Sequence, residues 1–378
     1  MKGMTGMEFI YENLLNLHWN QIIMWVIGGV LIYLAIKKDM EPTLLLPLGF
    51  GAILVNLPMS GAITQIVDGV TEIGVIDTLF NAGIANELFP LLLFIGIGAM
   101  IDFTPLLTNP KMLFFGAAAQ FGIFFTFSMA SLFGFDIKDA ASVAIIGAAD
   151  GPTSIFIANY FNSKYIGAII VAAYSYMALV PIIQPFVIKR ITTKEERSIK
   201  MEYSRNQVSK KTKILFPIII TVIAGIFAPK SVALIGFLMF GNLVRECGVL
   251  RMLSESAQKE LANLITLLLG ITIATKMQAN IFLTWDTLLI MGLGLIAFVF
   301  DTFGGVMFAK FLNLFSKNKI NPMIGAAGIS AFPMSARVIH KMGLEEDPQN
   351  FLLMHAVGAN VAGQIASVIA GGLIINLI

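Results

Sequence analysis

The chain has 378 residues, of which 57% are hydrophobic and only 13% charged, with a mean hydropathy of +0.83. Soluble domains carry roughly 25% charged residues, so this composition predicts an all-α integral membrane protein surrounded by a lipid bilayer. The net charge of +2 gives no sign of a nucleic-acid partner, and we expect none. A single cysteine, Cys247, excludes a disulfide framework within the chain and a cysteine-based metal cluster.

Apolar segments follow one another along almost the whole chain. Residues 1–21 carry acids and no short apolar run that ends in a cleavage site, so we do not interpret them as a removable signal. Because one crossing of a ~30 Å hydrocarbon core needs roughly 20 residues, the chain accommodates about ten to twelve membrane segments. We expect them near 21–36, 43–57, 88–107, 112–134, 140–161, 165–188, 213–227, 231–244, 258–276, 286–315, 320–342 and 350–377. The mixed stretch 59–87 is expected to form surface or re-entrant helix.

A polar connector divides the chain. Residues 189–213 contain nine basic and three acidic side chains, which by the positive-inside rule places the connector in the cytoplasm. It is either a solvated loop or a docking surface for another subunit. The expected organisation is therefore a first half at 1–189 that includes the N-terminal membrane helix, a basic cytoplasmic linker at 190–212 and a second half at 213–378.

Three matches in the same order indicate that the two halves are related. IGAA at 146–149 recurs at 324–327, LLFIG at 92–96 resembles LLLG at 267–270, and LGFGAILVNL at 48–57 resembles IGFLMFGNLV at 235–244. Transporters with such repeats, commonly inverted, bind substrate near the bilayer midplane. An inverted repeat needs an odd number of crossings, so one segment of each half could be re-entrant, and the side of the N-terminus stays open.

The first motif, GAADGPTS at 147–154, places Asp150 beside Gly-Pro inside an apolar segment. Proline removes a backbone donor, so the helix should break there and free carbonyl oxygens near Gly147–Ala149. Carbonyl oxygens with one carboxylate suit a hard cation such as Na⁺. The structural alternative is that Asp150 only caps a helix, but an acid within the membrane is costly enough to make function the leading hypothesis.

The second motif, NPMIGAAGISAFPMSAR at 321–337, has hydroxyl groups and an arginine in place of the acid. Pro333 should break this segment as well, which leaves Ser330 and Ser335 as candidate oxygen ligands on either side. Arg337 could pair with Asp150, hold a carboxylate in bidentate geometry, or form a structural salt bridge. The two motifs thus predict one broken helix per half at mid-membrane.

Other polar residues in apolar surroundings are individually weaker signals. Tyr176 could relay a proton or make an interhelical hydrogen bond, and Asn360 could reach the same cavity. Lys276 and Asp301 are interpreted as snorkelling or surface-paired side chains. No phosphate-binding loop, nucleophile elbow or HExxH helix is present, so direct coupling to ATP is not expected.

At its two motifs the chain resembles the membrane β subunits of the biotin-dependent, sodium-pumping decarboxylases, which act on oxaloacetate, methylmalonyl-CoA, glutaconyl-CoA or malonate. GAADGPT together with NPMIGAAGISAFPMSAR is highly specific for this family. The resemblance implies an enzyme that decarboxylates carboxybiotin and exports Na⁺ while consuming a proton. Biotin would be carried covalently by a partner and not by this chain.

The resemblance also implies partners and residue roles. Expected partners are a carboxyltransferase or biotin-carrier subunit and a small membrane anchor subunit, with self-association, in the cell membrane of a prokaryote. The implied catalytic residues are Asp150, Tyr176 and Arg337, and the residues implied in carboxybiotin binding are Arg337 and Ser335. The implied sodium ligands are Asp150, Asn321, Gly325, Ser330 and Asn360.

A secondary Na⁺-coupled carboxylate transporter or cation/proton antiporter is the alternative, since broken helices around a midplane acid would look much the same. The acid or acyl-CoA used by the complex and the Na⁺ stoichiometry are not encoded in recognisable motifs.

Overall fold

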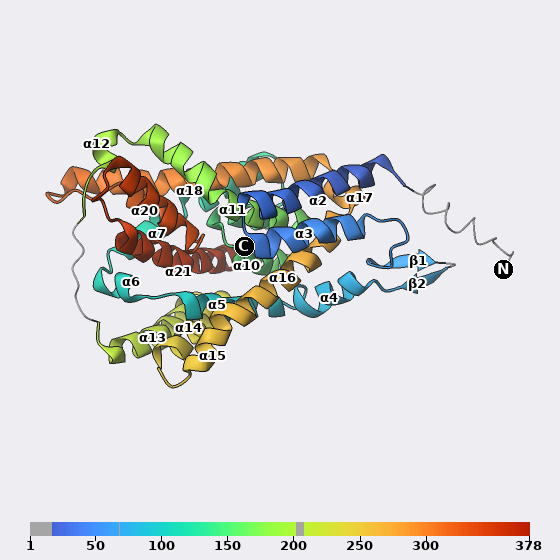
Figure 1. Ribbon diagram of the computed structural model, residues 1–378, viewed down its shortest axis with the longest axis horizontal. Coiled ribbons are helices and arrows are strands. Elements are labelled where there is room, and N and C mark those ends of the chain that lie inside the picture. The colour runs from blue at the N-terminus through green and yellow to red at the C-terminus, as the bar shows by residue number, and fades with distance from the viewer. Residues whose placement is uncertain (1–16, 68, 202–207) are drawn as a thin grey trace. The chain divides into compact units, whose positions relative to one another are not determined.

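The computed structural model of the protein describes residues 17–67, 69–201 and 208–378. Most of the described chain is helical and very little of it is strand, which confirms the all-α membrane class (Figure 1). Most of the N-terminal stretch interpreted as lacking a signal lies outside the described residues, as do Asp68 and the centre of the basic connector with Arg205.

Within the described residues, six helical stretches are long and apolar enough to cross a membrane. They are α2 (Trp19–Lys38), α7 with α8 (Met112–Ala118, Phe121–Leu132), α11 (Ile166–Ile191), α15 through η4, α18 (Trp285–Phe315) and α21 (Leu353–Leu377). The stretch from α15 to η4 comprises α15 (Arg251–Ser256), η3 (Ala257–Leu261), α16 (Ala262–Ile273) and η4 (Ala274–Met277). A seventh span results if α4 (Val75–Gly83) and α5 (Leu88–Met100) count as one.

The uninterrupted spans are fewer than ten to twelve because several expected segments are short or broken. Short apolar segments form α3 (Pro42–Val55) and α14 (Val232–Glu246), and α13 (Lys210–Phe227) begins in the basic connector. The two motif segments are each divided in two. The remaining short elements are α6 (Thr104–Thr108), α9 (Ile137–Ala144), η1 (Ile145–Ala148), α10 (Gly151–Tyr160), α12 (Lys194–Arg197), η2 (Pro229–Ser231), α17 (Ala279–Phe282), α19 (Met323–Ala326) and α20 (Met334–Glu346).

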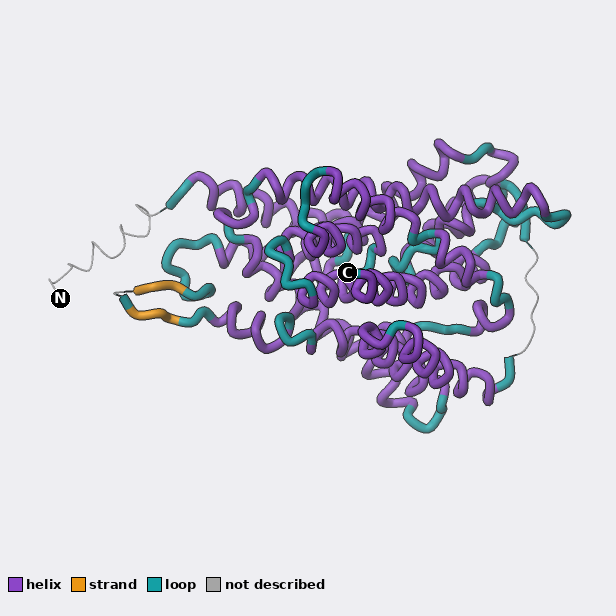
Figure 2. Tube along the Cα trace, turned by 180° about the vertical axis from the view of Figure 1, so that it is seen from behind, coloured by secondary structure: helices purple, strands orange, loops and turns teal. Residues whose placement is uncertain are grey.

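The stretch 59–87 forms a β-hairpin before its helix, which the sequence analysis did not anticipate. Strands β1 (Gln65–Val67) and β2 (Val70–Glu72) pair antiparallel, and Figure 2 shows them in orange. Gly69 between them has a φ of 77°, a left-handed conformation that glycine adopts without a Cβ clash. Only α4, which follows the hairpin, agrees with the expected surface or re-entrant helix.

The chain divides into two compact units, and neither corresponds to a sequence half. The first unit comprises the chain up to residue 89 together with 263–289. Here α2 and α3 cross so closely that a Cβ at Gly28 or Gly49 would lie 2.6 Å from the carbonyl oxygen of the other glycine. Asn56 joins the end of α3 to the η4–α17 region by donating to the Met277 carbonyl at 2.8 Å.

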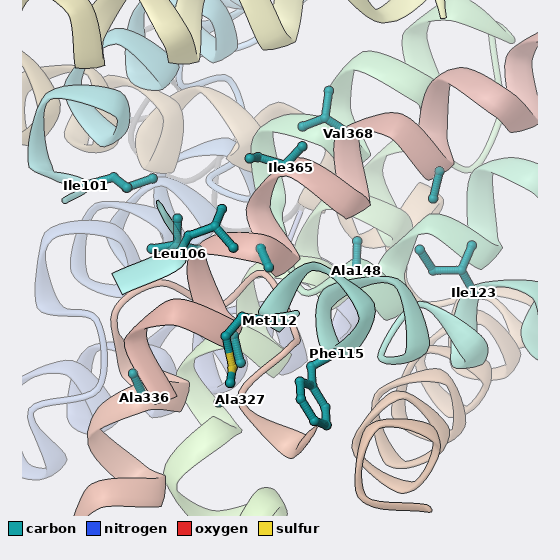
Figure 3. Packing of buried hydrophobic residues seen from close by; sticks show 14 of the residues in the cluster. Ile101, Leu106, Met112, Phe115, Ile123, Ala148, Ala327, Ala336, Ile365 and Val368 are labelled. Atoms are coloured by element: carbon teal, nitrogen blue, oxygen red, sulfur yellow. The ribbon is translucent and has the colours of Figure 1, made fainter. Parts of the chain in front are cut away.

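The second unit, residues 90–262 and 290–378, contains both motifs. Helix α21 is mostly buried and packs on α6, α7, α10 and α20. Figure 3 shows Ala148 of the first motif and Ala327 of the second within the same buried apolar cluster as Ile365 and Val368 of α21. Each unit draws on both sequence halves, and the repeat relation between the halves stays a prediction.

Charged side chains tie helix ends together within the second unit. Asp102, just after α5, lies 4.0 Å from both Lys213 of α13 and Arg245 of α14. Burial opposes ionisation of Asp102, but hydrogen bonds from Thr104 and the two cations together lower the pKa of its carboxyl below the usual 3.8. At the connector, Arg197 forms a largely buried ion pair with Glu346 of α20 at 2.5 Å. This part of the connector therefore packs against the second unit, to which it belongs.

Candidate functional site

The first motif breaks its helix where the sequence predicts. The 3₁₀ turn η1 ends at Ala148, the next residue Ala149 has a left-handed φ of 51°, and α10 begins at Gly151 with Pro152 in its first turn. Proline is tolerated there because the first N–H groups of a helix have no intrahelical acceptor. Asp150 sits at the junction and is 3% exposed. Its Oδ2 accepts hydrogen bonds from the hydroxyls of Thr153 at 2.5 Å and of Ser367 at 3.5 Å.

The second motif breaks after α19 and meets the first motif directly. Residues 327–333 are not helical, and α20 starts after Pro333. The Ser330 backbone N–H donates to the Ala148 carbonyl at 3.2 Å. The two broken segments, about 180 positions apart in the sequence, are therefore in contact at their breaks.

Helix α21 presents one polar face to both breaks. Asn360, Gln364 and Ser367 follow one another at spacings of four and three, so they lie on the same side of the helix. Asn360 Nδ2 donates to the Ile329 carbonyl at 2.6 Å, and Gln364 Nε2 donates to the Ser330 carbonyl. The hydroxyl of Ser330 donates in return to the Gly363 carbonyl at 3.0 Å.

Several buried oxygens around these breaks have no hydrogen-bond partner. They are Asn360 Oδ1, Gln364 Oε1 and the Tyr174 hydroxyl, whose ring packs against Gly151. A buried polar atom without a partner costs roughly 1–3 kcal/mol. Oxygens of amides, hydroxyls and carbonyls beside one carboxylate are the ligands that a hard cation prefers. This oxygen-rich cluster, formed by Asp150, Ser330, Asn360 and Gln364 with their backbone neighbours, is called the cation cluster below.

Other expected site residues lie elsewhere in the unit. The hydroxyl of Tyr176 donates to the Met291 carbonyl, and its ring faces Gly294 of α18 rather than Asp150. Asn321 is fully buried at the start of α19, where it accepts from the Met323 N–H and donates to the carbonyls of Arg197 and Ile199. It therefore anchors the basic connector.

Gly325 and Ser335 are both engaged in packing within the second unit. Gly325 touches the Gly305 backbone so closely that a Cβ at either position would collide with the other's carbonyl. Ser335 is fully buried and is hydrogen-bonded to Gln184.

Arg337 is exposed on α20 and forms no ion pair with the buried Asp150 among the described residues. The pairing of these two side chains that the sequence allowed is therefore not formed.

The sequence interpretation of Asp301 is wrong. Instead of lying at a surface, its side chain is fully buried in α18, and its Oδ1 accepts from the Gly122 backbone N–H at 2.6 Å. The sequence analysis assigns no role to Gln364 and does not identify Ser367, because a lone serine in a small-residue helix carries no signal. The spacing of Ser367 from Asn360 and Gln364 is the feature that could have identified it.

Two broken helices that meet at a buried carboxylate, in a chain with six helical stretches long enough to cross a membrane among its described residues, define a polytopic membrane protein. Residues 20–378 match the family described as the Na⁺-transporting oxaloacetate decarboxylase beta subunit, and the chain belongs to this family. The chain is thus the beta subunit of a multi-subunit Na⁺-transporting decarboxylase.

Curated relatives match this chain over nearly their full lengths. The methylmalonyl-CoA decarboxylase subunit beta of Propionigenium modestum is 47% identical, with 96% of each chain covered. The glutaconyl-CoA decarboxylase subunit beta of Acidaminococcus fermentans is 47% identical over 95% of this chain and 94% of the relative. A probable oxaloacetate decarboxylase beta chain of Vibrio cholerae is 43% identical over 97% of each. Family membership favours the decarboxylase over the secondary transporter considered from sequence.

Proposed function

We propose that this chain decarboxylates carboxybiotin and couples the reaction to Na⁺ export through the cation cluster. The observation that supports this most is the buried Asp150 at the contact of the two breaks, with orphaned oxygens nearby. Decarboxylation replaces an N–COO⁻ group by N–H and CO₂, so each turnover consumes one proton. Na⁺ and the proton would compete for Asp150, and the arrival of Na⁺ would release the proton toward the biotin ring.

The proposed path for export is a change between two states of the helices around the cation cluster. A ligand shifts such an equilibrium only by its differential affinity for the two states. Na⁺ would bind from the cytoplasm to Asp150, Asn360 and backbone carbonyls near Gly147–Ala149, and the state that follows decarboxylation would open this cluster to the other side.

Carboxybiotin contacts are proposed for the cytoplasmic face. Arg337 is exposed, and its guanidinium can hold a carboxylate in bidentate geometry. Ser335 stays a predicted contact, although its hydroxyl is already engaged with Gln184. Asn321 and Gly325 stay predicted contributors to sodium binding, with the geometry pointing to indirect roles through packing. Tyr176 stays a predicted proton relay, with its hydroxyl directed to α18.

The proposed partners are those that a reaction on carboxybiotin requires. A partner subunit carries biotin covalently and delivers it after carboxyl transfer, and a small membrane subunit anchors the assembly. We also propose self-association of this chain and a location in the cell membrane of a prokaryote.

The test is CO₂ release from carboxybiotin by the purified chain in liposomes, with and without Na⁺. The proposal predicts release that Na⁺ stimulates, and loss of that release in Asp150→Asn. Exchange of radioactive Na⁺ without any CO₂ release would instead indicate a secondary transporter.

A further inference from the structure

Gln184 is a buried amide of α11 to which the proposed reaction assigns no role. Its side chain is fully buried, and its nitrogen donates to the Ala326 carbonyl at 2.7 Å and to the Ser335 hydroxyl at 2.8 Å. Ala326 is the last residue of α19, and Ser335 lies in the first turn of α20. One side chain of α11 therefore joins the two helices that flank the second break.

The non-helical segment that this amide closes at its base carries part of the cation cluster. It contains the Ile329 carbonyl, to which Asn360 donates, and Ser330, whose hydroxyl donates to the Gly363 carbonyl. Because Gln184 is bonded at both ends of the segment, it limits how far residues 329 and 330 can move away from α21.

The turn of α11 that leads to Gln184 also packs on the first break. Val180, one helical turn before Gln184, is fully buried in an apolar cluster with Ala149 and Ile329. Ala149 is the left-handed residue of the first break, and Ile329 belongs to the second. Residues 180–184 of α11 thus contact both breaks, one through apolar packing and the other also through hydrogen bonds.

These side-chain contacts matter more because α11 is weakened at the same turn. Pro181 and Pro185 lie inside the helix, and proline has no backbone N–H to donate. The carbonyls four residues before each proline therefore lack their usual helical donor. The hydrogen bonds of Gln184 hold this turn against the second break where backbone bonds are missing.

We propose that Gln184 is a positioning residue of the cation cluster. Through Ala326 and Ser335 it holds the segment 327–334 in the arrangement in which Ser330 and the partners of Asn360 surround Na⁺. The inference rests on the proposed binding of Na⁺ at the cation cluster, and it adds a residue that does not touch the ion. An amide that only joined helices would contribute to stability alone, whereas a positioning residue also sets the affinity for the ion.

Thermal unfolding of the purified full-length chain, titrated with NaCl against choline chloride at constant ionic strength, tests the inference without any substrate. A ligand that binds only the folded state raises the unfolding temperature according to its affinity, so the titration reports apparent Na⁺ affinity. Gln184→Met replaces the amide by an unbranched apolar side chain of similar size. We expect it to weaken apparent Na⁺ affinity about tenfold or more, as for other residues that orient metal ligands.

Two further variants define the contact. Gln184→Asn keeps an amide that is one methylene shorter, so it should cause a smaller loss of Na⁺ affinity, and it keeps the test usable if Gln184→Met does not fold. Ser335→Ala removes one of the two acceptors of the Gln184 amide. Combining Ser335→Ala with Gln184→Met should add little to the loss, because both changes remove the same contact.

The matched control is Asn242→Leu. Asn242 is also a buried amide of the second unit, and its nitrogen donates to the carbonyls of Gly98 and Ile101, away from both motifs. Asn242→Leu should lower the unfolding temperature and leave apparent Na⁺ affinity unchanged.

The outcomes separate the inference from the function on which it rests. If Na⁺ stabilises wild type and the Gln184 variants with equal affinity, Gln184 is only a structural amide, and the inference is wrong while the cation cluster stands. An equal loss of affinity in Asn242→Leu would also overturn it. A wild type that Na⁺ does not stabilise would overturn both the cation cluster and the role of Gln184.

Discussion

Asn360 uses only part of its amide in the described hydrogen bonds. Its nitrogen donates to the Ile329 carbonyl at 2.6 Å, and its fully buried oxygen has no partner. An unused oxygen of this kind is what the proposed role of Asn360 as a sodium ligand requires, because most buried polar atoms that serve packing alone are hydrogen-bonded. At the residue scale, the cation cluster is defined by such unused oxygens as much as by its carboxylate.

Replacing Asn360 by alanine is predicted to weaken apparent Na⁺ affinity about tenfold or more, since a bond to a charged group contributes roughly 1.5–3 kcal/mol. The measurement is the Na⁺ dependence of CO₂ release. Ser142→Ala is the control, because Ser142 is equally buried but donates only to the Lys138 carbonyl of its own helix. Unchanged Na⁺ affinity in Asn360→Ala would remove Asn360 from the ligand set.

The lowered pKa of Asp102 predicts how the thermal stability of the protein changes with pH. Its pKa is lowered in the folded state, because the hydrogen bonds from Thr104 and the nearby Lys213 and Arg245 outweigh the effect of burial. A carboxyl with a depressed folded-state pKa stabilises the fold above its unfolded pKa, and this contribution is lost as pH falls through the folded-state value. Asp102→Asn should therefore lower the thermal unfolding temperature at neutral pH, and the difference should shrink below the usual carboxyl pKa and disappear below the lowered folded-state pKa.

The control for Asp102 is Glu255→Gln, which removes an exposed pair with Arg251 and should change the unfolding temperature little. An equal loss for Asp102→Asn at neutral and strongly acidic pH would show that packing, and not charge, holds the end of α5.

At the scale of elements, helix contact near the second motif depends on paired glycines. The α18 residue Gly305 and the α19 residue Gly325 touch through their backbones, so a methyl group at either position must separate the two helices. Small residues allow this close approach in membrane proteins. A loss of activity on substitution of Gly325 would thus be explained by disturbed helix packing as readily as by lost sodium binding.

Alanine at Gly305 is predicted to reduce the yield of folded protein and the thermal unfolding temperature. Alanine at Gly292 of the same helix, where nothing lies within 4 Å of the added Cβ, should be neutral or stabilising by about 0.5–1 kcal/mol. Thermal unfolding in detergent measures both variants. Equal behaviour of the two would contradict the close contact between α18 and α19.

The breaks were predictable from sequence because proline and glycine act locally. Pro152 and Pro333 interrupt their helices as expected. The hairpin before α4 also has a local sequence signal, the Asp68-Gly69 pair, which is typical of a two-residue turn and which the sequence analysis did not use.

Burial and pairing could not be predicted in the same way. Asp301 lies in the apolar helix α18 and is fully buried, whereas Arg337, at the end of the second motif, is exposed. Which side of a helix faces the core depends on packing between segments far apart in the sequence, such as the Ser330–Ala148 contact. In addition, the periodicity of apolar residues along a helix is a weak guide where nearly every residue is apolar.

At the scale of the whole molecule, the proposed mechanism uses one group, the carboxyl of Asp150, for both decarboxylation and Na⁺ transport. If Asp150 binds either Na⁺ or the proton that carboxybiotin needs, then neither event proceeds without the other. Removing the carboxylate should abolish both together, by about a hundredfold or more in rate, as for a lost general acid.

The most direct test records CO₂ release and radioactive Na⁺ uptake simultaneously, using the assembled complex in liposomes, for wild type, Asp150→Asn and the control Ser142→Ala. If Asp150 couples the two processes, the rates of CO₂ release and Na⁺ uptake should stay in a fixed ratio in wild type and control, and both should be lost in Asp150→Asn. Continued Na⁺-dependent CO₂ release by Asp150→Asn, with or without Na⁺ uptake, would contradict the central role of Asp150.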